Sequence, residues 1–173
     1  MISHPLAFMR LPYDLLVALD SRMFHFWMQP VHYLVRLVHI LAMAVFFGMD
    51  VLFDLSLMRR DYRAERAIVA RLTFWWMHWL FAVTMVSGVL LFFYDPVHIG
   101  SRGYLSPKLL LMTLALINAA ICHNRLYIPA LRGQAVSLVR ARTGAGISLA
   151  LWTGVIIMSC LNSEGVPKVF LRG

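Results

Sequence analysis

The stretch that decides the fold is LVRLVHILAMAVFFGMDVLFDLSLM, residues 34–58. A helix needs about 20 apolar residues to cross the hydrocarbon core of a bilayer, and this stretch is long enough. Every backbone N–H and C=O inside a bilayer must be paired within its own segment, which favours an α-helix over irregular structure. We therefore predict that residues 34–58 form a transmembrane helix, although Arg36, Asp50 and Asp54 interrupt the apolar run.

Three further apolar stretches follow, over residues 72–94, 106–126 and 145–161. The whole chain of 173 residues is 61% hydrophobic, with a mean hydropathy of +0.73. That is more apolar surface than one water-soluble core can bury, so lipid must act as its solvent. The sequence predicts an all-α integral membrane protein, a four-transmembrane-helix bundle over residues 31–173.

Residues 1–30 form a separate N-terminal segment in this interpretation. Between residues 12 and 28, leucine and aromatic side chains alternate with Asp14, Asp20 and Arg22. Such a mixture is typical of an amphipathic helix that lies in the membrane interface. A docking surface for a partner subunit would have the same composition, and both readings stay open.

The net charge of +8 reflects membrane topology rather than nucleic-acid binding, because the basic residues flank the apolar stretches. Two short loops carry most of them: Arg59, Arg60, Arg63, Arg66 and Arg71 in the first, and Arg125, Arg132, Arg140 and Arg142 in the third. The positive-inside rule places both loops in the cytoplasm and therefore both termini, with Lys168 and Arg172, on the periplasmic face. The expected location is the bacterial inner membrane.

Local signals predict where the helices begin and end. Asp95-Pro96 should close the second helix, and Ser106-Pro107 should give the third an N-cap and a first-turn proline. Gly100, Gly103 and Pro107 should keep the loop between the second and third helices non-helical. Gly144 and Gly146 should precede the fourth helix, which would then be the shortest.

Polar side chains recur along one line of the first helix. At 100° per residue they share a face with two apolar residues, and this seam comprises His32, Arg36, His39, Met43, Phe46, Asp50 and Asp54. A charged group at the centre of a lipid-facing helix costs roughly 2.5–3.5 kcal/mol. The seam is therefore predicted to face the interior of the bundle.

Sorted by depth, polar residues of the other helices form two groups with the seam. His39 and Lys108 lie toward the outer side, whereas Asp50, Asp54, His78 and His123 lie toward the cytoplasm. Two imidazoles at matching depth on neighbouring helices are what a b-type haem needs as axial ligands, and arginines such as Arg36, Arg102, Arg71 and Arg125 are candidates to pair with its propionates. The candidate haem or metal ligands are His39, His78 and His123.

The two aspartates admit several interpretations, because a carboxylate at this depth must be protonated, paired or solvated. They can pair with His78 or an arginine, relay protons, or join His78 and His123 in a hard-metal site. A structural pair that holds the bundle together is an equal alternative.

The runs VRLVHILAMAVFFGMDVLFDLSLMRR and SPKLLLMTLALINAAICHNR resemble small bacterial four-helix membrane proteins. More distantly, they are similar to the copper-resistance-D-type membrane domain and to the haem-binding oxygen-independent protoporphyrinogen oxidases. In the oxidases a histidine early in the first helix and a lysine early in a later helix form the haem site. The resemblance implies that His39 and Lys108 play those roles here.

Three functions follow as hypotheses. The first is a b-type haem-binding membrane subunit in electron transfer, with a quinone or a periplasmic redox protein as its partner. The second is a non-catalytic subunit of a larger membrane complex, and the third is transport of a metal ion or proton along the seam. The sequence holds no P-loop, Rossmann glycine run or His-Glu-x-x-His motif, so redox chemistry is the enzymatic class that remains.

Overall fold

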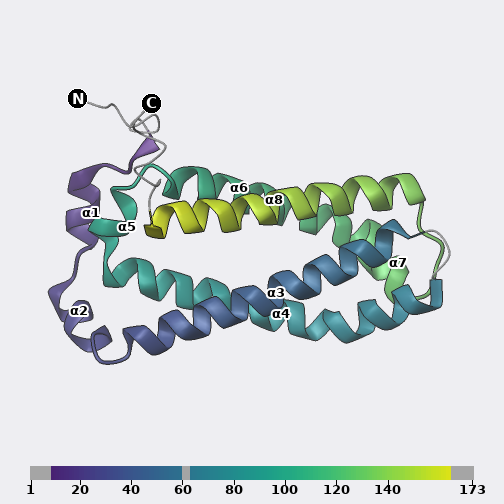
Figure 1. Ribbon diagram of the computed structural model, residues 1–173, viewed down its shortest axis with the longest axis horizontal. Coiled ribbons are helices and arrows are strands. Elements are labelled where there is room, and N and C mark those ends of the chain that lie inside the picture. The colour runs from purple at the N-terminus through teal and green to yellow at the C-terminus, as the bar shows by residue number, and fades with distance from the viewer. Residues whose placement is uncertain (1–8, 60–62, 165–173) are drawn as a thin grey trace.

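Four helices long and apolar enough to cross a membrane dominate the computed structural model, which describes residues 9–59 and 63–164. These two ranges contain no strand. The long helices lie side by side in one bundle (Figure 1), and they are α3 (His32–Met58), α4 (Arg63–Tyr94), α6 (Leu105–Cys122) and α8 (Leu138–Glu164). The predicted all-α fold with four membrane-spanning helices is confirmed.

The connection between α4 and α6 contains an unexpected helix. As predicted, α4 ends at Tyr94, just before Asp95-Pro96. The loop predicted to be non-helical instead forms α5 (Pro96–Gly100), because the Asp95 side chain accepts a hydrogen bond from the backbone N–H of His98 at 3.2 Å. An aspartate cap followed by proline is a signal that starts a helix as readily as it ends one.

The predicted N-cap of α6 at Ser106 is wrong. The helix begins at Leu105, and the cap position, Tyr104, makes no side-chain cap bond. Ser106 lies inside the first turn, where its hydroxyl donates to the carbonyl of Met9 at 2.6 Å. This serine therefore ties the N-terminal segment to the bundle.

The fourth long helix begins at Leu138 rather than at residue 145, so Gly144 and Gly146 lie within it. Gly144 is buried against α6. A Cβ atom at this position would come within 2.8 Å of the Cys122 sulfur and 2.9 Å of a Leu126 methyl carbon. Here the glycine permits close approach of two helices, which is a common use of small residues in membrane bundles.

Beyond Cys122, α6 continues into a π-helical turn, η2 (His123–Tyr127), and a short helix, α7 (Ile128–Leu131). The sequence predicted a regular helix to residue 126 and did not anticipate this π-helical turn. It brings Tyr127 onto α4, where its hydroxyl donates to the carbonyl of Ala70 at 3.0 Å. Single π-helical turns occur frequently at functional sites.

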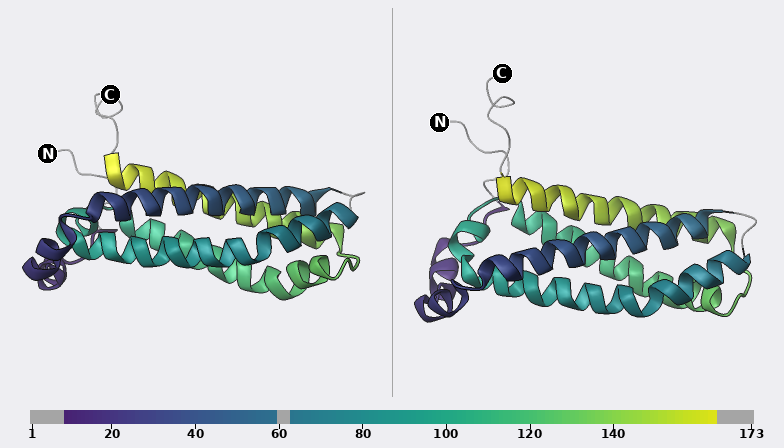
Figure 2. Two further views of the ribbon diagram at one scale, coloured as in Figure 1. Left: turned by 90° about the horizontal axis from the view of Figure 1, so that it is seen from below. Right: turned by 60° about the horizontal axis from the view of Figure 1, so that its bottom comes forward.

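The N-terminal segment forms two short helices, α1 (Tyr13–Leu19) and α2 (Arg22–Met28), rather than the single helix predicted over residues 12–28. They lie at one end of the bundle (Figure 2). Leu16 of α1 is fully buried against Gly100 of α5, whereas α2 exposes most of Phe26 and Trp27. This combination fits the predicted interfacial segment, with one face on the protein and aromatic side chains turned outward.

The arginines of the two predicted cytoplasmic loops gather at the other end. The described arginines of these loops belong to α4, η2 and the chain ends of α3, α7 and α8 that lie away from α1, α2 and α5 (Figure 1), and they are Arg59, Arg66, Arg71, Arg125, Arg132, Arg140 and Arg142. We call this the Arg-rich end. Arg60, the side chain of Arg63, Lys168 and Arg172 fall outside the described part of the chain. The asymmetry that underlies the predicted topology is therefore present in the fold.

Helix packing leaves one side of the bundle open. Helix α3 packs along both α4 and α8, and α6 packs along α8. Helix α4 contacts the segment formed by α6, η2 and α7 chiefly through α7, near the Arg-rich end. We call the side between α4 and α6 the α4–α6 opening.

Candidate functional site

The deeper half of the seam faces the bundle interior, as predicted. Phe46, Asp50 and Asp54 are only 7%, 6% and 4% exposed. These positions follow one another at four-residue spacing, so they descend one face of α3 over roughly 12 Å. Arg36 departs from the prediction, because it is exposed although it falls on the same line.

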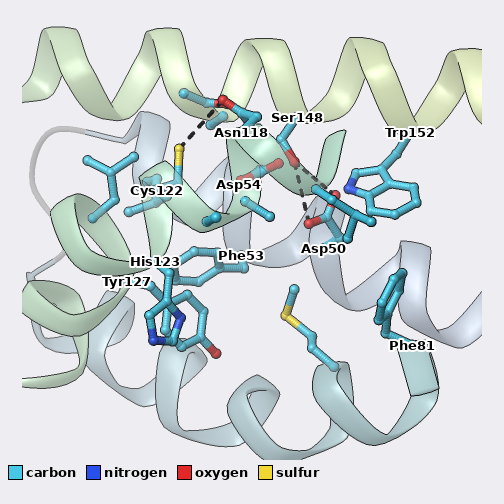
Figure 3. A pocket seen from close by; sticks show the side chains of 18 of the residues that line it. Asp50, Phe53, Asp54, Phe81, Asn118, Cys122, His123, Tyr127, Ser148 and Trp152 are labelled. Carbon is cyan, nitrogen blue, oxygen red and sulfur yellow. Dashed lines mark hydrogen bonds between the residues drawn. The ribbon is translucent and has the colours of Figure 1, made fainter. Parts of the chain in front are cut away.

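A cavity of about 340 Å³ lies beside the two aspartates (Figure 3). All four long helices contribute to its lining. Its polar and ionisable side chains are Asp50, Asp54, His78, Asn118, Cys122, His123, Tyr127 and Ser148. The remaining walls are apolar, so these few groups are enclosed largely by hydrocarbon and aromatic rings.

Asp50 and Asp54 differ in their partners. The hydroxyl of Ser148 on α8 lies 3.3 and 3.5 Å from the two carboxylate oxygens of Asp50 and donates to them. Oδ2 of Asp54 is buried and has no hydrogen-bond partner in the part of the chain that the structure describes. Among the described residues, neither aspartate forms a hydrogen bond with His78 or an arginine, so that predicted pairing stays a prediction. For Asp50 the described partner is a serine hydroxyl.

Aromatic rings close the cavity on both sides of the carboxyl groups. Away from the Arg-rich end, Phe46, Phe81 and Trp152 meet from three helices, with ring centroids 5.0–6.1 Å apart. Toward the Arg-rich end, the rings of Phe53 and Tyr127 pack at 4.4 Å. The two acids thus lie between two aromatic walls, as the labelled side chains of Figure 3 show.

The mouth of the cavity lies at the α4–α6 opening. Some lining residues are exposed, and they come from these two helices alone: His78 from α4, and Leu116, Ala119 and Ala120 from α6. The lining residues from α3 and α8 contain no exposed side chain. Ala119 and Ala120 add little bulk at the mouth, which His78 and His123 flank, so the cavity reaches the side of the bundle between α4 and α6, the region that lipid fills.

His78 and His123 approach one another across this opening, as predicted from their depth. Their ring centroids are 6.2 Å apart, and the rings are nearly perpendicular at 81°. Nδ1 of His78 lies 2.7 Å from the carbonyl oxygen of Phe74 and donates to it, which leaves Nε2 available. The π-helical turn presents His123, whose ring stacks on Tyr127.

His39 does not belong to this cavity. Its Nδ1 lies 3.0 Å from both the Thr84 carbonyl oxygen and the Ser87 hydroxyl, and its ring packs on Gly88. Lys108 lies within electrostatic reach of it, as the predicted outer group requires. The two predicted groups are therefore separate in space, and His39 cannot complete a ligand set with His78 and His123.

The other predicted ligand sets are not assembled. No group of three or more His, Cys, Asp or Glu side chains in the described ranges is arranged to hold a metal ion, so the predicted set of both aspartates with both histidines is wrong. Arg102 instead donates to the carbonyls of Asn162 and Ser163 and closes the end of α8. Arg71 and Arg125 are exposed.

Comparison with protein-family models, curated proteins and solved structures found no match to this chain. The resemblance to the copper-resistance-D-type and protoporphyrinogen oxidase proteins thus stays a prediction from short motifs. The cavity itself carries the functional argument.

Proposed function

We propose that the protein binds a cation at Asp50 and Asp54 and carries it across the membrane in exchange for protons. The observation that carries this proposal is the orphaned Oδ2 of Asp54, which lines a cavity between membrane-spanning helices. A buried polar atom without a partner is costly and rare in native proteins, and a bound ion is one of the explanations for it.

The charge balance of the cavity supports exchange. No described lysine or arginine lines it, and the two carboxyl groups lie one helical turn apart. Two close carboxylates in a low-dielectric site cannot both remain ionised without a counter-charge. A bound cation and a bound proton are alternative ways to supply that charge, so arrival of one releases the other. The other titratable groups that line the cavity are His78, Cys122, His123 and Tyr127.

The test is cation-driven proton movement in proteoliposomes. Vesicles contain the purified protein and a pH-sensitive dye, with potassium and valinomycin fixing the membrane potential. Na⁺, tetraethylammonium and tetraphenylphosphonium are added outside in turn, and protein-free vesicles give the background. At least one probe should change the internal proton concentration by more than it does in protein-free vesicles. Asp54→Asn should reduce that signal to less than about a tenth, because the amide cannot bind or release a proton.

Asp20→Asn provides the matched control. Asp20 is an exposed carboxylate between α1 and α2, outside the cavity, so its loss should leave exchange unchanged. Asp50→Glu, which keeps the carboxyl group, should retain part of the signal. Absence of proton movement with all three probes, or full exchange in the Asp54→Asn protein, would show that the aspartates carry no cation.

A second candidate is the b-type haem subunit predicted from the sequence. The approach of His78 and His123 favours it, because their ring centroids lie 6.2 Å apart and these two side chains would hold the haem iron. Bound haem would supply one-electron chemistry, and a quinone or a periplasmic redox protein would be its electron partner. Both histidines border the mouth of the cavity, where a flat group has access.

An absorption spectrum tests this candidate. Protein purified from cells supplied with haem should show a Soret band and a reducible α-band, and His78→Ala or His123→Ala should abolish both. His39→Ala should have no effect, since His39 lies elsewhere in the bundle. A spectrum without these bands, or bands that depend on His39 alone, would rule out the His78–His123 pair as haem ligands.

We further propose that the Arg-rich end faces the cytoplasm of a bacterial inner membrane and that α1 and α2 lie on the periplasmic side. The gathering of seven described arginines at one end supports this orientation. The outward Phe26 and Trp27 of α2 also suit contact with another membrane subunit. Co-purification of such a subunit, lost on Phe26→Ser and Trp27→Ser together, would identify that contact.

A further inference from the structure

We infer that the cation is a lipophilic organic monocation that reaches Asp50 and Asp54 from the bilayer through the α4–α6 opening. This inference rests on the proposed cation–proton exchange and names its substrate class. It follows from three properties of the cavity: its walls, its ligands and the position of its mouth.

The walls suit an organic cation. Aromatic faces attract cations through their quadrupole, most strongly for tryptophan, and desolvated sites increase the effect. Phe46, Phe81 and Trp152 converge on one side of the carboxyl groups and Phe53 and Tyr127 on the other. A cation that carries apolar substituents can contact these rings and still place its charge beside Asp54.

The ligands do not suit a bare metal ion. Ca²⁺ and Mg²⁺ require about six oxygen ligands or several retained waters. Besides the aspartates, the lining side chains that carry oxygen are Asn118, Tyr127 and Ser148. The Asn118 oxygen accepts from the Cys122 thiol, the Tyr127 hydroxyl donates to the Ala70 carbonyl, and the Ser148 hydroxyl donates to Asp50, while hydrocarbon lines most of the cavity. An organic cation needs only charge compensation and van der Waals contact, because it holds few waters that must be replaced.

The mouth opens toward lipid rather than toward either aqueous face. Leu116, Ala119 and Ala120 border it from α6, and Met77 and Phe81 line the α4 side behind His78. A hydrated ion would have to cross hydrocarbon to use this route. A lipophilic cation concentrates in the bilayer and meets the opening directly. On arrival, the O–H bond of a protonated carboxyl group breaks, the proton leaves to water, and the cation pairs with the carboxylate.

Binding of tetraphenylphosphonium to the full protein in nanodiscs tests the inference. Calorimetry and the proton release into a weakly buffered solution are measured together. We expect saturable binding with about one proton released per cation. Asp54→Asn should weaken binding at least about tenfold, since it removes the counter-charge. Trp152→Leu should weaken binding about 2- to 30-fold, because it removes the strongest cation–π contact.

Two controls separate charge and site from general hydrophobicity. Tetraphenylborate has the same size and the opposite charge, so its binding should not depend on Asp54 or Trp152. Trp75→Leu changes an exposed tryptophan outside the cavity and should leave tetraphenylphosphonium binding unchanged. Circular dichroism of each variant confirms that it is folded, and Trp152→Phe should retain most of the affinity if Trp152→Leu proves unstable.

The outcomes also separate this inference from the proposed function. Exchange driven by Na⁺ and dependent on Asp54, without binding of tetraphenylphosphonium, would overturn the organic cation and leave the cation–proton exchange intact. Tetraphenylphosphonium binding that is indifferent to Asp54, or equal to that of tetraphenylborate, would overturn the inference as well. Loss of Asp54 dependence with every probe would overturn both.

Discussion

Asp54→Leu is expected to make the protein more stable while abolishing cation–proton exchange. Asp54 is 4% exposed and leaves a carboxylate oxygen without a partner in the described structure. A buried polar group left without a hydrogen bond costs about 1–3 kcal/mol, and an apolar side chain at the same position removes that cost. The adjoining cavity of about 340 Å³ has room for the larger leucine. Equilibrium unfolding in mixed micelles with increasing SDS measures the change in the free energy of unfolding.

Two variants show whether the gain is specific to the unpaired acid. Asp50→Leu should gain less stability, because it also removes the carboxylate to which the Ser148 hydroxyl donates its hydrogen bond. Asp20→Leu, at an exposed position, should change stability by less than about 0.5 kcal/mol. A clear loss of stability in Asp54→Leu would favour the alternative in which the aspartates are a structural pair that holds the helices together.

Arg66→Met is expected to lower the free energy of unfolding by about 2–4 kcal/mol, since hydrogen bonds to charged groups contribute about 1.5–3 kcal/mol each. Arg66 is buried at 5% exposure near the start of α4. Its guanidinium donates to the carbonyls of Ser56, at 3.4 Å, and Arg59, at 2.8 Å, at the end of α3. It therefore caps one helix from the next, and methionine can replace its packing but not its donors.

Arg71→Met is the matched control for this prediction. Arg71 lies on the same helix and carries the same charge, but its side chain is exposed. Both variants remove one positive charge from the Arg-rich end, so an effect on topology would appear in both. An equal loss of stability in the two proteins would mean that the charge matters and the contacts with α3 do not.

The number and positions of the long helices could be predicted from the sequence because hydrophobic length and backbone pairing leave few alternatives in a bilayer. The inward direction of Asp50 and Asp54 followed from the cost of exposing charge to lipid. The start of α8 could not be predicted. Gly144 looks like a helix breaker, whereas its contact with Cys122 is a tertiary effect that the local sequence does not record.

Only part of the cavity could be predicted from the sequence. Ser148 and Trp152 are four residues apart and therefore share one face of α8, but nothing in the sequence indicates that this face meets Asp50. The π-helical turn that presents His123 and Tyr127 has no clear sequence signal, because it depends on packing against α4. Helix pairing also decides which side stays open, and the α4–α6 opening could not be inferred from single-helix patterns.

The most direct test of the account is infrared spectroscopy of the protein in lipid, with and without saturating tetraphenylphosphonium. Without the cation, wild-type protein should show a deuterium-sensitive carboxylic acid band that Asp54→Asn removes. The band should disappear when the cation binds, as the proton leaves and a carboxylate forms. A carboxylic acid band that persists in Asp54→Asn, or that cation binding leaves unchanged, would contradict the claim that Asp54 exchanges a proton for a cation.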